Sequence, residues 1–163
     1  MTMTKKHKLR ILLVCTGNIC RSPTAEGVLR AHLERAGLAS QIDVDSAGTH
    51  GYHVGDPPDE RSQAAAARRG YDISGLRARR VAHDDFSRFD LILAMDREHL
   101  ALLQRSSPTS SRSRLGLFLD YAPNAARDEV PDPYYGGPAG FEHVLDLIED
   151  AAAGLIETLR QEK

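Results

Sequence analysis

The segment best suited to chemistry is a short loop, 14–23 (VCTGNICRSP), in which five residues separate a cysteine from an arginine. Successive backbone N–H groups of such a loop can converge on one point and bind an anion. A guanidinium group can hold two oxygens of a phosphate, and a nearby arginine or helix N-terminus favours the thiolate form of a cysteine. The spacing therefore predicts a phosphate-binding loop in which Arg21 holds the phosphoryl group and Cys15 attacks it.

The other residues of this loop have predicted roles in shaping it. Gly17 allows the backbone to turn where a side chain would clash, and Ser22 can donate a hydrogen bond to the cysteine sulfur and help it to leave. The predicted binding residues of the loop are Thr16, Gly17, Asn18, Ile19, Cys20 and Ser22. The alternative is that Cys15 is a buried cysteine at a strand end and Arg21 a surface residue at a helix start.

The predicted elements place this loop at the end of a strand. Leu9–Val14 is a short, apolar, β-branched run that ends before Gly17, as expected for a buried strand of a parallel sheet. The predicted strands are 9–14, 41–45, 89–95 and 115–119, and the predicted helices are 24–36, 60–69, 96–104 and 141–160. This alternation indicates an α/β fold, a three-layer α/β/α sandwich with a four-stranded parallel sheet and helices on both faces. Ligands of such folds bind at the carboxyl ends of the strands, where Cys15 lies.

Composition excludes several classes of protein. The 163 residues are 41% hydrophobic and 27% charged, which indicates a folded chain: a flexible basic N-terminus, 1–8, followed by one domain, 9–163. A net charge of −2 gives no indication of nucleic-acid binding. The two cysteines and seven histidines fit no common structural zinc spacing, so we expect no metal. The apolar run 11–14 is too short for a signal peptide or a membrane span, so we expect a cytoplasmic location.

The loop around Cys15 resembles the signature loop of the low-molecular-weight protein tyrosine phosphatases. Three further segments resemble parts of that family: 45–49 (DSAGT) the exit of the second strand, 94–96 (AMD) the exit of the third strand, and 132–136 (DPYYG) the general-acid loop. They occur in the family's order and spacing, so the resemblance covers nearly the whole chain. It implies hydrolysis of phosphotyrosine in a protein or peptide through a cysteinyl-phosphate intermediate, by a monomer that needs no cofactor.

The resemblance also implies the roles of residues outside the loop. Asp132, held between two prolines, is the general acid that protonates the leaving oxygen and then the base that activates water. Tyr134 and Tyr135 form one aromatic wall of a deep cleft, and Tyr52 stands on the opposite wall. The alternatives are that Asp132 is a turn aspartate before a proline and Tyr52 an ordinary loop aromatic.

Supporting residues are implied in the same way. Asn18 and Ser46 fix the loop by hydrogen bonding, and Asp96 pairs with Arg79 across the top of the sheet. The sequence departs from the family at Leu76, because many relatives have there a histidine that braces the phosphate loop, whereas leucine cannot form that hydrogen bond.

Three other functions are compatible with parts of the sequence, and each lacks a feature that it would need. An arsenate reductase of the same fold needs resolving cysteines further along the chain, and none follows Cys20. Arginine phosphatases of the family resemble this loop but tend to have threonine at the position of Ile19 and usually lack the paired tyrosines. A phosphopeptide-binding module without catalysis would have lost Cys15, Arg21 or Asp132, and all three are present.

A disulfide between Cys15 and Cys20, formed with peroxide, is a further hypothesis for protection of the nucleophile.

Overall fold

A parallel four-stranded sheet with the strand order β2-β1-β3-β4 forms the centre of the molecule. The computed structural model describes residues 8–134 and 137–161. The helices and strands along the chain are β1 (Leu9–Cys15), α1 (Arg21–Arg35), β2 (Ile42–Gly48), α2 (Glu60–Arg68), α3 (Asp85–Arg88), β3 (Leu91–Ala94), α4 (Arg97–Ser106), β4 (Arg114–Leu117), the 3-10 helix η1 (Phe118–Tyr121) and α5 (Pro138–Gln161).

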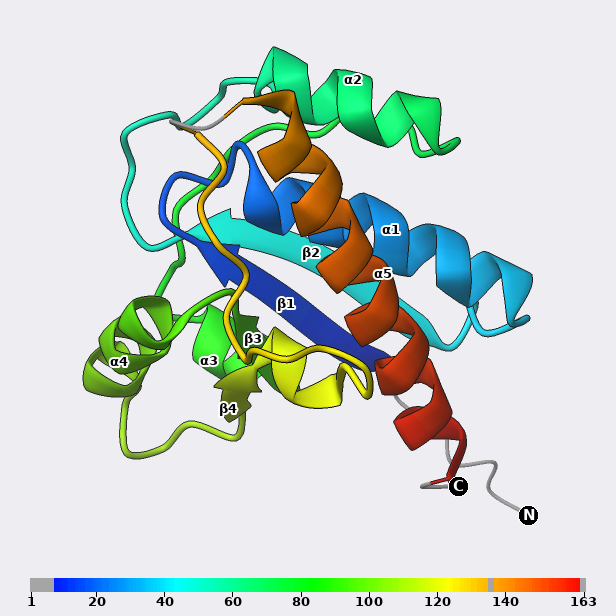
Figure 1. Ribbon diagram of the computed structural model, residues 1–163. Coiled ribbons are helices and arrows are strands. Elements are labelled where there is room, and N and C mark those ends of the chain that lie inside the picture. Colours follow the sequence, from blue (N-terminus) through cyan, green and yellow to red (C-terminus); the bar gives the residue numbers. More distant parts are fainter. Residues whose placement is uncertain (1–7, 135–136, 162–163) are drawn as a thin grey trace.

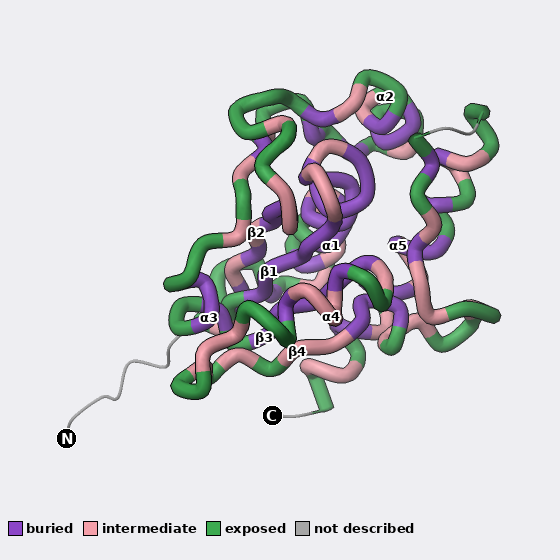
Figure 2. Tube along the Cα trace, turned by 90° about the vertical axis from the view of Figure 1, so that its left-hand side faces the viewer, coloured by how far each residue is buried: buried purple, intermediate pink, exposed green. Residues whose placement is uncertain are grey.

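Helices cover both faces of the sheet, which confirms the predicted three-layer α/β/α sandwich (Figure 1). Side chains of a strand alternate between the two faces, so β1 contributes to two separate cores. Ile11 and Leu13 pack in the core under α1 and α5, whereas Leu12 and Val14 pack with the residues of α3 and α4. All four of these β1 side chains are fully buried. In Figure 2 the buried stretches follow the strands and the inner faces of the helices.

The register of the sheet brings three strand ends to one edge. Cys15 at the end of β1 lies opposite Gly48 at the end of β2, and Val14 lies opposite Ala94 at the end of β3. Because the strands are parallel, the segments that leave them start side by side. The catalytic candidates that follow these strands are therefore assembled at a single edge.

Several element boundaries differ from the predicted ones. The α1 helix begins at Arg21 rather than residue 24, and residues 118–119 lie in a 3-10 turn instead of a strand. The α3 helix was not predicted, because four residues are too few to show a helical period. The α5 helix begins at Pro138, earlier than expected, since a proline is tolerated in a first helical turn. In the part of the chain that the structure describes, no helix is both long and apolar enough to cross a membrane.

The α5 helix packs very closely on η1 at Gly154. A Cβ atom at this position would overlap the carbonyl oxygen of Tyr121, and it would lie 3.1 Å from Cδ of Pro123. The close approach of α5 to the segment that follows β4 therefore requires a glycine in the middle of a helix, where glycine is otherwise unfavourable.

We expect Gly154→Ala to lower the free energy of unfolding by about 2 kcal/mol or more, because the new methyl group clashes with backbone that cannot move freely. Urea denaturation measures the change. Gly140→Ala in the first turn of α5 is the control, since a Cβ there meets Pro133 at an ordinary 3.7 Å. A more stable G154A chain, as helix propensity alone would give, would contradict this account of the packing.

Candidate active site

The loop between β1 and α1 has a fixed and unusual backbone shape. Cys15 is the last residue of β1, and Arg21 is the first of α1. Asn18 has a positive φ of 61°, a conformation that asparagine tolerates better than most residues. Cys20, at the N-cap position of α1, makes no capping hydrogen bond with its side chain. The loop thus curls over a helix N-terminus, where unpaired N–H groups favour an anion.

The exit of β2 supports the first residues of the loop. Backbone N–H groups of Thr49 and His50 donate to the carbonyl oxygens of Cys15 and Thr16, at 2.8 and 3.0 Å. A Cβ on Gly48 would lie 2.6 Å from the Thr16 oxygen, so this approach of two backbones requires glycine. The predicted family-like segment 45–49 therefore serves as a backbone brace for the loop.

Cys15 and Cys20 lie in different chemical settings. Cys15 Sγ is 3.0 Å from the hydroxyl oxygen of Ser22, which is itself fully buried. Burial is the main cause that raises the pKa of Cys20 to about 12, so its thiol keeps its proton near neutral pH. The Ser22 hydroxyl is placed to stabilise charge on the Cys15 sulfur, whereas at Cys20 the hydrogen bond from Ser62 lowers the thiol pKa by less than burial raises it.

A chain of buried polar side chains holds the loop from behind. The Asn18 amide nitrogen donates to Ser22 Oγ at 2.8 Å and to Ser46 Oγ at 2.9 Å. Ser46 Oγ donates to Glu26 Oε1 at 2.7 Å, and burial raises the pKa of the Glu26 carboxyl. The Asn18 amide oxygen accepts from the Arg79 N–H at 3.0 Å. The hydrogen bonding expected of Asn18 and Ser46 is present, and it reaches Ser22 beside the nucleophile.

Arg21 is buried, and protein groups bind one side of its guanidinium. Nη1 donates to Asp96 Oδ2 at 2.9 Å and to the Val130 carbonyl oxygen at 3.0 Å. Nη2 lies 3.8 Å from Asp132 Oδ2, on the side of the cleft. One side of the guanidinium is thus anchored, and Nη2 faces the place where an anion would bind.

The predicted pairing of Asp96 with Arg79 is wrong. Asp96 pairs with Arg21, and Arg79 instead pairs with Asp45 at 3.0 Å and with the buried Asp85 at 2.9 Å. The reason is the position of Arg79: its carbonyl oxygen accepts from Gly48 N–H, so it runs beside the end of β2, away from β3. Leu76 packs against the core and does not brace the loop. The backbone N–H of Arg79 does so instead, by donating to the side-chain oxygen of Asn18.

His99, in the first turn of α4, joins the same cluster. Its Nε2 lies 2.7 Å from Thr16 Oγ1 and 3.5 Å from Arg21 Nη2. Burial and the positive charge of Arg21 lower the pKa of His99 to about 4, so the imidazole is neutral near pH 7. Partial burial alone would raise the pKa of Asp96, but hydrogen bonds from the His99 backbone N–H and from Arg21 lower it. The cluster therefore holds an ionised aspartate, a charged arginine and a neutral histidine.

Asp132 reaches the cleft from the segment 128–134, which also contacts Arg21 through the Val130 carbonyl oxygen and Arg97 through Asp128 and Glu129. The Val130 N–H donates to the Met95 carbonyl oxygen at 2.8 Å, and Asp132 Oδ1 accepts from the Tyr134 N–H at 3.0 Å. The Asp132 side chain is half exposed. Arg61 covers the Tyr134 ring at 5.1 Å and donates to the Tyr134 carbonyl oxygen at 2.9 Å. The position predicted for Tyr135 lies outside the described residues.

These groups line one cleft of about 280 Å³. Tyr52 lines it as well, with its ring stacked on His50 at 5.1 Å and 73% exposed. The lining residues are Cys15, Thr16, Gly17, Ile19, Cys20, Arg21, Tyr52, His53, Asp132 and Tyr134. The structure thus brings the predicted nucleophile, arginine, acid and two of the three predicted tyrosines to one place.

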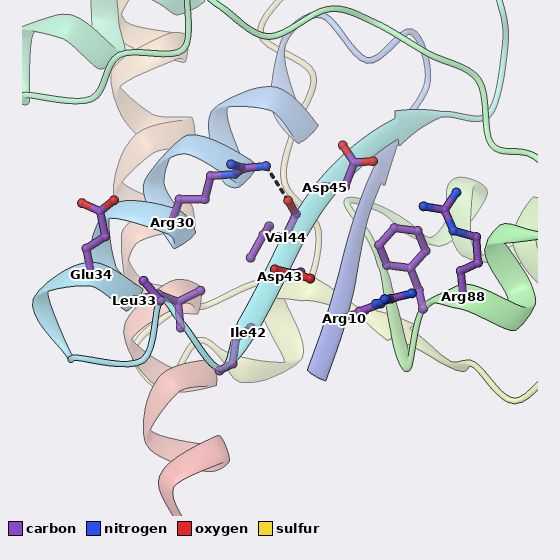
Figure 3. A pocket seen from close by; sticks show the side chains of 11 residues that line it. Arg10, Arg30, Leu33, Glu34, Ile42, Asp43, Val44, Asp45 and Arg88 are labelled. Atoms are coloured by element: carbon purple, nitrogen blue, oxygen red, sulfur yellow. Dashed lines mark hydrogen bonds between the residues drawn. The ribbon is translucent and has the colours of Figure 1, made fainter. Parts of the chain in front are cut away.

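A larger hollow of about 620 Å³ lies along β2 and the C-terminal half of α1 (Figure 3). It is lined by three arginines and three acidic residues, so the formal charges of its lining cancel. Arg30 already has partners: it donates to the Val44 carbonyl oxygen at 2.6 Å, as Figure 3 shows. It also pairs with Glu26 at 2.7 Å. Its lining includes no cysteine, serine or histidine, so this hollow is not a candidate for nucleophilic chemistry. Within residues 8–134 and 137–161, no group of three or more His, Cys, Asp or Glu side chains is placed to hold a metal ion.

Sequence reasoning missed His99, Arg61 and His53 as site residues. His99 follows Asp96 by three residues, and that spacing puts both on one side of the first turn of α4, which could have indicated a contact. His53 carries no comparable signal, because it reaches the cleft from the loop 49–59. Arg61 lies in α2 and contacts the site only through Tyr134.

Known proteins resemble this chain over nearly its whole length. Residues 10–163 match the protein family described as low molecular weight phosphotyrosine protein phosphatase. The chain is 45% identical to the low molecular weight protein-tyrosine-phosphatase of Streptomyces coelicolor, over 94% of each chain. It is 39% identical to the human low molecular weight phosphotyrosine protein phosphatase, over 95% of this chain and 98% of that one. The crystal structure of a protein tyrosine phosphatase from Entamoeba histolytica, with Hepes in its active site, superposes with a TM-score of 0.92 at 38% identity, covering 95% of this chain and 99% of that one.

The neutral, buried His99 has a consequence for stability. Between about pH 6.5 and 4 the unfolded chain binds a proton at this residue that the folded protein excludes, so stability falls as the pH falls through this window. Between pH 6.5 and 4.5 the free energy of unfolding of both chains should fall. We expect it to fall by roughly 1–2 kcal/mol less in the His99→Gln variant than in the original chain, as measured by urea denaturation at each pH. Exposed His83, replaced by Gln, is the control. Parallel pH curves for H99Q and the original chain would contradict a neutral His99.

Proposed function

Because the chain belongs to the low molecular weight phosphotyrosine protein phosphatase family, we propose that it hydrolyses phosphotyrosine in proteins or peptides through a cysteinyl-phosphate intermediate. One observation carries the proposal. Cys15 Sγ lies beside the Ser22 hydroxyl in a cleft that Arg21 Nη2 and Asp132 also line, and these last two are 3.8 Å apart. Nucleophile, anion-binding group and proton donor thus converge on one substrate-sized volume.

In the first step the phosphoryl group binds to the loop N–H groups and to Arg21. The Cys15 sulfur attacks phosphorus, an S–P bond forms, and the bond to the tyrosyl oxygen breaks. Asp132 gives its proton to that oxygen, which leaves as a phenol. Negative charge on the equatorial oxygens is stabilised by donors that the loop already holds in place, which costs little reorganisation.

In the second step water attacks the cysteinyl phosphate. Asp132, now ionised, accepts a proton from the water as an O–P bond forms and the S–P bond breaks. The Ser22 hydroxyl donates to the departing sulfur, at the 3.0 Å contact already present in the free protein. The products are inorganic phosphate and the restored cysteine.

Aromatic side chains beside the cleft favour tyrosine over serine as the phosphorylated residue. Tyr52 and Tyr134 both line it, and both rings project from loops at the rim. A phosphotyrosine ring can stack between aromatic walls, whereas phosphoserine is too short to bring its phosphate to the floor while making such contacts.

Removal of the acid tests its role. We expect Asp132→Ala to lower kcat on phosphotyrosine by about 10²–10⁴-fold, because the phenolate must then leave without a proton. Binding of inorganic phosphate should stay nearly unchanged, since the loop and Arg21 are intact. On an aryl phosphate with a strongly acidic phenol the loss should shrink, because that phenolate leaves readily unprotonated.

The matched control is Asp128→Ala, which removes a carboxylate of the same segment that pairs with Arg97 and does not line the cleft. This variant should keep normal turnover. Equal loss in D128A and D132A would assign the effect to the segment rather than to the Asp132 carboxyl.

The substrate class is tested with matched peptides that carry phosphotyrosine, phosphoserine or phosphoarginine. We expect the highest kcat/KM on phosphotyrosine, and no turnover of any peptide after Cys15→Ser. Faster hydrolysis of phosphoarginine would favour the arginine phosphatase alternative. Equal rates on phosphoserine would contradict the role of the aromatic rim, and full activity of C15S would overturn the mechanism.

A further inference from the structure

His99 is almost completely buried, and one of its ring nitrogens has no hydrogen-bond partner. It is 2% exposed, and Nδ1 forms no hydrogen bond with any described residue. Buried polar atoms without a partner are rare in native proteins and usually have a reason. The nearest acidic group is Asp96 Oδ1, 3.1 Å from Nδ1, at an angle that does not make a hydrogen bond.

The surroundings of Nε2 decide which ring nitrogen carries the proton. Arg21 can only donate, and its Nη2 lies 3.5 Å from Nε2. A proton on Nε2 would point at another N–H group, so Nε2 is the unprotonated nitrogen and Nδ1 carries the proton toward Asp96. The Thr16 hydroxyl, 2.7 Å from Nε2, must therefore donate to it. With this tautomer Nε2 is the acceptor for both of its neighbours, and the Nδ1 proton lies on the side of Asp96, 3.1 Å away, without hydrogen-bond geometry.

The histidine thus links two parts of the phosphate site that come from opposite ends of the loop. Thr16 directly follows the nucleophile, and Arg21 begins α1. Both line the cleft, while His99 itself does not. Arg21 lies on the Nε2 side of the ring, and the Asp96 carboxylate lies 3.1 Å from Nδ1 on the other side.

We propose that His99 is a positioning residue, whose neutral imidazole accepts a hydrogen bond from Thr16 and keeps the Arg21 Nη2 group directed into the anion site. The proposal rests on the proposed function only for its kinetic consequences, since the arrangement of an anion site can be measured without catalysis. A protonated or missing ring at this position would free the Thr16 hydroxyl and leave Nη2 without a neighbouring acceptor on that side.

Three substitutions in the full chain separate hydrogen bonding from packing. His99→Gln places an amide oxygen near the Nε2 position, whereas His99→Leu fills similar space without an acceptor, and Thr16→Val removes the donor. We expect H99L and T16V each to weaken sulfate binding and to lower kcat/KM by about fivefold to tenfold, as for a lost hydrogen bond at a partly buried site. H99Q should stay within about threefold of the original chain.

Sulfate binding is measured by calorimetry at pH 7, kcat and KM with a phosphotyrosine peptide, and folding by thermal denaturation. The double variant H99L/T16V should be no worse than either single variant, because both remove the same contact. Additive losses, equal weakness of H99Q and H99L, or unchanged sulfate binding in H99L would overturn the proposal. If H99L does not fold, the T16V variant is sufficient: unchanged sulfate binding by T16V would overturn the proposal. An original chain that binds sulfate but does not hydrolyse phosphotyrosine contradicts the proposed function and leaves this test intact.

Discussion

A guanidinium removed from water imposes the main constraint on this structure. Arg21 is 4% exposed, and an unpaired buried charge would cost several kcal/mol. Asp96, at the N-cap of α4, and the carbonyl oxygen of Val130 compensate it from one side. These two partners come from segments far apart in sequence, so satisfying one charge ties the start of α1 to α4 and to the segment that carries Asp132. The remaining nitrogen, Nη2, is directed into the cleft, and the anion site follows from this incomplete pairing.

The loop between Cys15 and Arg21 contains a strained residue, Asn18, and a network of buried hydrogen bonds fixes its conformation. Asn18 adopts a positive φ, which costs on the order of 1 kcal/mol for a residue with a side chain. Its amide offsets this cost with hydrogen bonds to Ser22, to Ser46 and from Arg79. Glu26 ends the network at a carboxyl that burial makes harder to ionise. Donors fixed in place by such a network bind an anion at a low entropic cost, which favours electrostatic catalysis.

Local features of the site were predictable, whereas contacts between distant segments were not. The loop 15–22 lies within eight consecutive residues after a strand, so residue type and spacing were enough to predict it and the strand that presents it. Asp96 was correctly placed at a strand exit, yet its partner was predicted wrongly. The choice between Arg21 and Arg79 depends on which side of β1 each arginine occupies, and no pattern of residue types encodes that. His53 reaches the cleft from the irregular segment 49–59, and irregular segments carry no period from which to infer a direction. Arg61 lies in α2, and its contact with Tyr134 joins residues 73 positions apart.

The proposed anion site and the proposed proton donor lie on parts of the molecule that differ in burial. The binding loop joins a central strand to a helix, and its side chains Asn18, Cys20, Arg21 and Ser22 are all buried. Asp132 is half exposed on the segment 128–134, which is held through both backbone groups of Val130 and by Arg97 at Asp128 and Glu129. A carboxyl that must both give and take a proton needs contact with water in the second step, and full burial would deny it that contact. The rim segment can also differ in sequence without disturbing the buried network, since it touches that network mainly at the Val130 carbonyl and the Asp132 carboxyl. The proposed reaction thus combines a buried anion site with an acid that water can reach.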